Sequence, residues 1–260
     1  MFEELLRGGQ INDAMTQLRE KVRARPADAK LRVLLFQLLC VTGEWDRALA
    51  QLNVASELDP ANLLMAQVCR PAIQCEVFRA EVFSGKRQPL LLGQPTQWVA
   101  WIIQANVVRA AGDLPQSADL LAKAFEEAPA TSGTIGAEKF QWIADADNRL
   151  GPMLEAIING GYYWVPFANI RKIELDAPSD LRDVVWAPAR FTWVNGGEAV
   201  GLIPARYDQS ESSKDSAIQL ARRTEWAQLS GDLYRGIGQR IFATDAGEHP
   251  ILETRLIVNN

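Results

Sequence analysis

The stretch that decides the fold of the N-terminal half reads Gly43-Glu-Trp-Asp-Arg-Ala48-Leu-Ala-Gln-Leu52-Asn-Val-Ala55-Ser-Glu-Leu-Asp-Pro60. It has an echo 34 residues earlier, at Gly9, Ala14, Leu18 and Pro26, and a second echo 69 residues later, at Gly112, Leu121, Ala124 and Pro129. A period near 34 is typical of the tetratricopeptide type of helical repeat. Such repeats present a groove to other proteins, so the stretch predicts a binding protein.

The repeat units are unequal in the N-terminal half. The first unit is truncated, because only Phe2 to Arg7 precedes its second helix. The third unit is fuller, and Pro115 suits the first turn of its second helix. Between Pro60 and the third unit no turn signal appears, and the sequence predicts one long helix over Leu63–Phe83, kinked at Pro71.

The composition is that of an ordinary globular protein. Of 260 residues, 48% are hydrophobic and 23% charged, and the net charge is −5. No basic face predicts a nucleic-acid partner, no apolar run is long enough to span a bilayer, and the start lacks a secretory pattern. The three cysteines, Cys40, Cys69 and Cys75, lie in predicted helices, which favours buried packing in a reducing cytoplasm over disulfides.

The pattern changes beyond about residue 138 from helical periodicity to short alternating runs, which predicts a largely antiparallel β half with the form of a small barrel. Hairpin turns are expected at Asn195–Gly197 and Asp245–Gly247, and a polar surface loop at Gln209–Ser216. The predicted strands are Phe140–Ala144, Met153–Ile158, Tyr162–Val165, Ile170–Leu175, Val184–Val194, Glu198–Ile203, Gln239–Thr244 and Leu252–Val258.

The predicted fold is therefore α+β with two domains. A tetratricopeptide-like α-α superhelix occupies residues 1–135, and a mainly antiparallel, barrel-like β domain occupies residues 136–260. About two and a half repeat units are fewer than a free-standing array needs. We therefore expect the β domain to be docked on the helical domain as a cap.

Residues that could carry chemistry are few. Asp145, Asp147 and Glu155 form the one plausible carboxylate cluster, which could hold a divalent cation in a metal-dependent hydrolase or form a turn braced by Arg149. The single histidine, His249, argues against multi-histidine metal sites and catalytic triads. Glycines at 231, 236 and 238 lack the context of a nucleotide site. We expect no enzyme activity and no cofactor, with the hydrolase as the alternative.

Several uncommon short motifs in the second half resemble those of the ImpE/SciE family, also called the TagJ family. The resemblance covers nearly the whole chain. The motifs are Trp142-Ile-Ala-Asp-Ala-Asp147-Asn-Arg-Leu-Gly-Pro152, Tyr162-Tyr-Trp-Val-Pro166, Asp180-Leu-Arg-Asp183-Val-Val-Trp-Ala-Pro188, Ile203-Pro-Ala-Arg-Tyr207, Ala221-Arg-Arg-Thr-Glu-Trp226 and Gly238-Gln-Arg240. Proteins of this family are accessory components of bacterial type VI secretion systems. The resemblance implies a cytoplasmic, non-enzymatic protein that contacts the small subunit of the contractile sheath, near the Clp-type ATPase that recycles it.

The leading hypothesis is an adaptor that captures an amphipathic helix or extended segment of a sheath protein. A purely structural scaffold acting as a homodimer is a further alternative, and the sequence leaves monomer and dimer open. No contact with nucleic acid or membrane is expected. The candidate partner-binding residues lie on the long helix, in the aromatic run and in the family motifs: Leu64, Val68, Phe78, Tyr163, Trp164, Arg182, Asp183, Arg206, Tyr207, Arg223 and Trp226.

Overall fold

A computed structural model describes residues 2–260, and its N-terminal end is a helical lobe. Each helix begins where the apolar stripe of the repeat begins, and turns at Gly9 and Gly43, both at positive φ, separate the paired helices. The lobe contains α1 (Phe2–Arg7), α2 (Ile11–Ala24), α3 (Ala29–Val41) and α4 (Trp45–Leu58).

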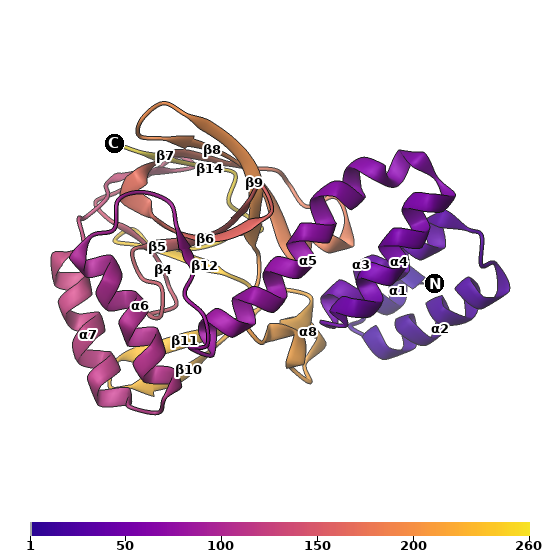
Figure 1. Cartoon of the computed structure of the whole chain (residues 1–260), viewed down its shortest axis with the longest axis horizontal. Helices are drawn as coiled ribbons and strands as arrows, with labels where there is room; N and C mark the ends of the chain where they lie inside the picture. The colour runs from indigo at the N-terminus through magenta and orange to yellow at the C-terminus, as the bar shows by residue number, and fades with distance from the viewer. Residues whose placement is uncertain (1) are drawn as a thin grey trace.

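The predicted long helix is confirmed as α5 (Leu63–Phe83), which follows the short 3-10 helix η1 (Pro60–Asn62). Its 21 residues span about 31 Å and carry the chain diagonally from the helical lobe to the β half. The third helical pair, α6 (Gln97–Ala110) and α7 (Leu114–Glu127), therefore lies on the opposite side of the molecule from α1–α4 (Figure 1). The helices do not form one continuous superhelix.

The main sheet has nine strands in the order β1-β6-β5-β9-β8-β7-β14-β2-β3, antiparallel except for the parallel pair β1–β6. It curls strongly (Figure 1), yet its end strands β1 and β3 are not paired with each other among residues 2–260, so it is not a closed barrel. The end strands are short, with two residues in β1 and three in β3. Strand bounds are β1 (Leu90–Leu91), β2 (Gly133–Ile135), β3 (Glu138–Phe140), β5 (Met153–Ile158), β6 (Gly161–Pro166), β7 (Ile170–Leu175), β8 (Trp186–Trp193), β9 (Glu198–Pro204) and β14 (Leu256–Asn259).

Two smaller sheets complete the β half. Strands β4 (Ile143–Asp145), β12 (Ile241–Thr244) and β13 (Glu248–Pro250) form one, and the hairpin of β10 (Thr224–Ser230) and β11 (Leu233–Gly238) forms the other. Both predicted turns are confirmed, between β8 and β9 and between β12 and β13. The β10–β11 hairpin was not predicted, because its three glycines resemble a loop. The polar stretch at 209–216 holds the 3-10 helix η4 (Ser210–Ser212) and the start of α8 (Ser216–Gln219).

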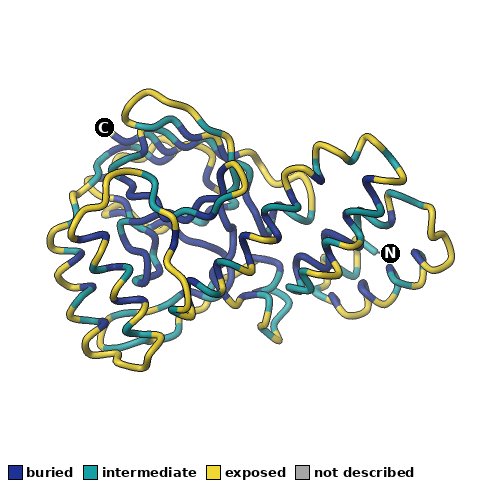
Figure 2. Tube along the Cα trace, in the orientation of Figure 1, coloured by how far each residue is buried: buried dark blue, intermediate teal, exposed yellow. Residues whose placement is uncertain are grey.

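One hydrophobic cluster runs from α2 through α3, α5 and α6 to Met153, Trp164 and Trp186 of the sheet. A second cluster fills the concave side of the curled sheet around Phe167, Phe191 and Phe242. Dark, buried segments therefore continue from the helical lobe into the β half along α5 (Figure 2). Among residues 2–260, no helix has the length and apolar character needed to cross a bilayer.

Candidate functional site

The first candidate site is a groove whose one wall is the N-terminal half of α5. Leu64 is 78% exposed and Val68 is 51% exposed, although both are large apolar residues. They are four residues apart on a helix, so their side chains lie one above the other on one face. This exposed stripe is where α5 extends beyond the β half.

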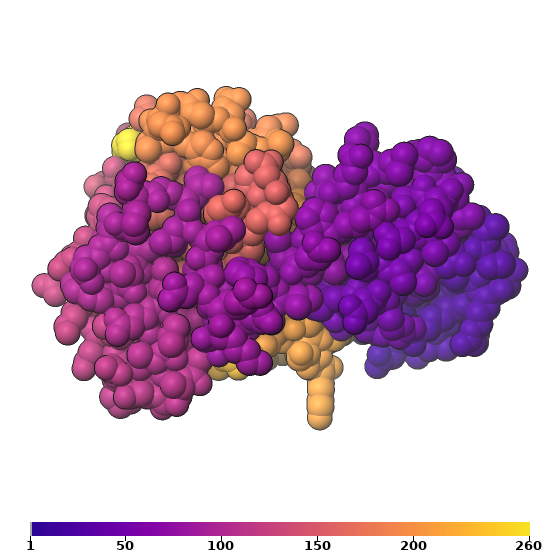
Figure 3. Space-filling model, viewed as in Figure 1, coloured from indigo at the N-terminus to yellow at the C-terminus, as the bar shows by residue number. Residues whose placement is uncertain are grey.

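The opposite wall of the groove is the sheet. Ile157 of β5, Pro188 of β8, and Val200 and Leu202 of β9 line it, and Val200 is 69% exposed. The groove has a volume of about 760 Å³. The space-filling view is hollowed at its upper edge between the helical lobe and the β half (Figure 3). Both walls are mainly apolar, as expected for a surface that receives an apolar helix face.

Pro71 fixes the inner end of the groove. The β5–β6 turn packs on it, since a Cβ on Gly160 would lie 3.2 Å from the Pro71 Cβ, and the Cys75 Sγ donates to the Gly160 carbonyl at 3.4 Å. Pro71 has no N–H, so the carbonyl of Gln67, four residues earlier, lacks its helical partner. Gln67 itself lines the groove beside the apolar stripe.

The rim of the groove carries balanced charge. Arg182 pairs with Asp180 at 2.7 Å and with Asp183 at 3.7 Å. The Asp183 carboxylate also accepts from the Asp180 backbone N–H at 2.8 Å, which fixes the 3-10 helix η3 (Leu181–Val184). Asp183 is therefore a buried positioning group, while Arg182 is half-buried and can reach a ligand in the groove.

Beneath the groove, a buried ionic network holds α5 on the sheet. Glu155 is fully buried and accepts from Arg79 Nε at 2.6 Å and Nη2 at 3.0 Å, and it also binds Arg240 and the Tyr162 hydroxyl. Arg79 further donates to the Arg206 carbonyl at 2.8 Å. Burial alone would raise the pKa of Glu155, but the guanidinium groups of Arg79 and Arg240 outweigh it and hold the pKa at about 2.

The carboxylate cluster predicted from the sequence is part of this network. Asp147 accepts from the Arg149 backbone N–H at 2.9 Å and from its Nη2 at 2.6 Å, which confirms the turn braced by Arg149. Asp145 accepts from the Asp147 N–H at 2.9 Å and binds Arg240. Among residues 2–260, no group of three or more acidic, histidine or cysteine side chains is arranged to hold a metal ion. Each of these carboxylates already binds a guanidinium, which leaves the hydrolase alternative without a free ligand set.

The network contains more carboxylates than guanidinium groups. Burial raises the pKa of Asp145 to about 7 and that of Asp208 to about 6, although Arg240 and Arg149 respectively oppose the shift. Apart from Asp183, which lies in η3 and pairs with Arg182, the buried charged side chains are five acids and four bases: Glu76, Asp145, Asp147, Glu155, Asp208, Arg79, Arg149, Arg206 and Arg240. The expected consequence of this imbalance is that Asp145 and Asp208 keep their protons to higher pH than free aspartic acid does.

The remaining predicted partner-binding residues fall into three groups by exposure. Trp164, Arg206 and Tyr207 are buried, and Arg206 donates to the carbonyls of Cys40 and Val41, which ties α3 to the β half. Phe78 and Tyr163 are half-buried. The residues with open surface outside the groove are Arg223, which pairs with Asp215 and Glu225, and Trp226, which is 38% exposed.

The structure brings in groove residues that the sequence did not single out. Pro188, Val200 and Leu202 line the same groove as Leu64 and Val68, because β9 pairs with β5 on one side and with β8 on the other. Val200 could have been found from the sequence, because it is an apolar residue just after a hairpin turn, where an exposed polar residue is expected.

Comparison with known proteins agrees with this architecture. The profile described as ImpE protein matches residues 137–258, and that of a tetratricopeptide repeat matches residues 5–69. The chain is 49% identical over 253 residues to the type VI secretion system accessory component TagJ of Pseudomonas aeruginosa, covering 97% of this chain and 89% of that protein. The chain belongs to the ImpE (TagJ) family.

A solved structure shares the whole fold of this family member. The crystal structure of a Vibrio parahaemolyticus protein superposes with a TM-score of 0.90 at 27% identity, covering 100% of this chain and 97% of that one. The arrangement of α5 between two helical groups and the curled sheet is therefore a property of the fold.

Proposed function

We propose that this chain is a cytoplasmic, non-enzymatic accessory component of a type VI secretion system that binds a contractile-sheath component. The name of its Pseudomonas relative supports the system, and the helical lobe supports protein binding. The partner we assign is the small sheath subunit. By holding it, the protein assists handling of the sheath by the Clp-type ATPase.

The observation that carries the proposal is the exposed stripe of Leu64 and Val68 facing Val200 across an apolar groove. An amphipathic helix of the partner fits such a groove with its own apolar residues at i, i+4 spacing. Gln67 and Arg182 add polar side chains to the lining of the groove. These polar groups would fix the register of the bound helix.

The test is binding of the purified protein to each purified sheath subunit by isothermal titration calorimetry. Leu64→Glu puts a charge on the apolar stripe and is expected to weaken binding at least tenfold. Leu114→Glu, at a 37% exposed position on α7 on the far side of the molecule, is the matched control and should change affinity less than twofold. Binding of neither subunit, or equal loss in both variants, would contradict the proposal.

The role with the ATPase needs a separate measurement. Disassembly of contracted sheath by the ATPase should be faster with the wild-type protein than with Leu64→Glu at equal concentration. A rate that does not respond to the protein would remove this part of the proposal and leave the sheath contact intact. Light scattering of the free protein decides between monomer and homodimer.

A further inference from the structure

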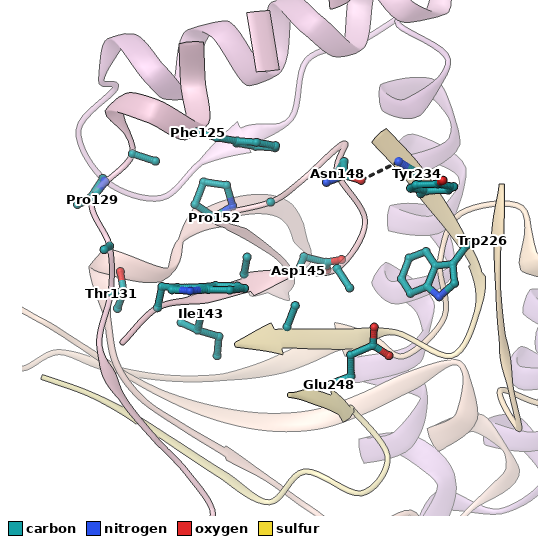
Figure 4. A pocket seen from close by; sticks show the side chains of 17 residues that line it. Phe125, Pro129, Thr131, Ile143, Asp145, Asn148, Pro152, Trp226, Tyr234 and Glu248 are labelled. Carbon is teal, nitrogen blue, oxygen red and sulfur yellow. Dashed lines mark hydrogen bonds between the residues drawn. The ribbon is translucent and has the colours of Figure 1, made fainter. Parts of the chain in front are cut away.

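A second cavity, of about 670 Å³, lies on the other side of the molecule between α7 and the β10–β11 hairpin. Its floor is formed by β4 and β12, and its walls are mostly aromatic and proline side chains (Figure 4). The principal lining residues are Phe125, Pro129, Trp142, Pro152, Trp226 and Tyr234. It shares no lining residue with the groove of the proposed function, so the two sites can be tested apart.

The charged side chains that line this cavity are both acidic. Its two charged lining residues are Asp145, whose carboxylate is bound by the buried Arg240, and Glu248, which is exposed. Among residues 2–260 the Glu248 carboxylate has no ion-pair partner, and no basic side chain lines the cavity. A single open carboxylate in an aromatic cavity favours a cation.

Aromatic faces lie beside that carboxylate. Trp226 and Tyr234 are each 38% exposed, and the Glu248 carboxylate points toward Trp226 (Figure 4). The Tyr234 N–H donates to Asn148 Oδ1 at 2.7 Å and its carbonyl accepts from the Asn148 N–H at 3.0 Å, which fixes the hairpin over the cavity. Trp226 also packs on Tyr207, with ring centroids 5.7 Å apart. The aromatic side of the site is therefore held in place without a ligand.

The opposite side of the cavity offers open backbone. The chain leaves α7 at Ala128, which is extended, and passes Ala130 and Thr131 before β2 begins. In the described part of the chain, the N–H and carbonyl groups of Ala130 and Thr131 take part in no hydrogen bond. Both residues line the cavity, so a second extended segment can pair with them along this edge.

We propose that this cavity binds an extended segment of a partner protein that carries an arginine and, two residues away, a large apolar side chain. Residues two apart on an extended segment point to the same side. The arginine lies against the Trp226 ring and pairs with Glu248, since a planar guanidinium both stacks on an aromatic face and binds a carboxylate through two N–H groups. The apolar residue lies against Phe125 and Pro152, and the segment's backbone pairs with Ala130 and Thr131.

The probe is the capped peptide acetyl-Gly-Leu-Gly-Arg-Gly-amide, titrated into the full-length protein labelled with ¹⁵N. The indole N–H signals of Trp142 and Trp226 report on the cavity, and the other six tryptophans serve as internal controls. The matched peptide replaces arginine by citrulline, which has the same shape and no charge. The protein variants are Glu248→Gln in the cavity and Glu198→Gln at an exposed position on β9 outside it.

The arginine peptide should shift the Trp142 and Trp226 signals saturably, and the citrulline peptide should bind about fivefold more weakly. Glu248→Gln should abolish the difference between the two peptides, whereas Glu198→Gln should keep it. Equal affinity for the two peptides would overturn the proposal. So would indole N–H signals of Trp142 and Trp226 that do not shift at the highest concentration of the arginine peptide. A homodimer that Trp226→Leu converts to monomer would also overturn it, because the cavity would then be an interface between copies.

Discussion

Replacing Arg79 by methionine tests the buried network that attaches α5 to the sheet. Arg79 is 4% exposed, and its guanidinium holds Glu155, Glu76 and the Arg206 carbonyl at 2.6 to 3.3 Å. Removing one member of a buried ion pair costs about 3–5 kcal/mol, because the remaining charge is left unpaired in a dry site. Glu155 retains Arg240 and the Tyr162 hydroxyl, so the lower end of that range, about 3 kcal/mol, is expected.

The measurement is urea unfolding followed by tryptophan fluorescence, with thermal unfolding as a second probe. A loss of about 3 kcal/mol corresponds to a melting temperature lower by about 6–12 °C for a chain of this size. The control is Arg87→Met, since Arg87 is 62% exposed and pairs with Glu81 at 3.2 Å. It should change the free energy of unfolding by less than about 1 kcal/mol.

A double-mutant cycle separates the pair from the rest of the network. Arg79→Met and Glu155→Gln each remove one side of the contact, and the double variant should lose less than the sum of the two by about 1–3 kcal/mol. Arg79→Met within 1 kcal/mol of wild type, or strictly additive losses, would refute the view that this network fixes α5 on the sheet.

Three further predictions concern stability and reactivity. Folding raises the pKa values of Asp145 and Asp208, so the unfolded chain loses these two protons at lower pH than the folded protein does. The free energy of unfolding should therefore fall as the pH rises from about 4 to about 7. Urea titrations across this range should show a smaller fall in Asp208→Asn than in the wild type. Gly160→Ala should destabilise the protein by about 1–2 kcal/mol in the same assay, because φ is +77° and the new Cβ would press on Pro71. All three cysteines are buried, and burial raises the pKa of Cys69 to about 11. They should therefore react with a thiol reagent at pH 8 only after urea is added. Rapid reaction of the native protein would contradict this.

Much of the fold followed from local signals in the sequence. The helix over Leu63–Phe83 was predictable because it lacks a glycine turn, and the structure accommodates Pro71 by packing the β5–β6 turn on it. The aromatic run was predicted to be mainly core, and Tyr162 and Trp164 are buried on one side of β6 while Tyr163 is half-buried on the other. Alternation along a strand carries this information directly.

The ionic partners could not be predicted from spacing. Arg79 meets Glu155 across 76 residues of sequence and Arg240 meets Asp145 across 95, so no local pattern joins them. The family motifs around Asp145, Tyr162, Arg206 and Arg240 therefore marked the network without revealing what its members do. The same limit applied to the aromatic cavity, where Trp142 comes from the β3–β4 connection, Trp226 from β10 and Glu248 from β13.

The groove exists because the rest of the protein buries the second half of α5 but leaves much of its first half exposed. In the second half of α5, from Ala72 to Phe83, seven residues are buried, whereas in the first half only Ala66 and Cys69 are. In a regular repeat array the next helical pair would cover Leu64 and Val68, but here that pair, α6 and α7, follows the long helix to the far side of the molecule. An apolar stripe kept open by the path of the chain itself is a surface that a partner helix can complete, in the position where the missing repeat would pack.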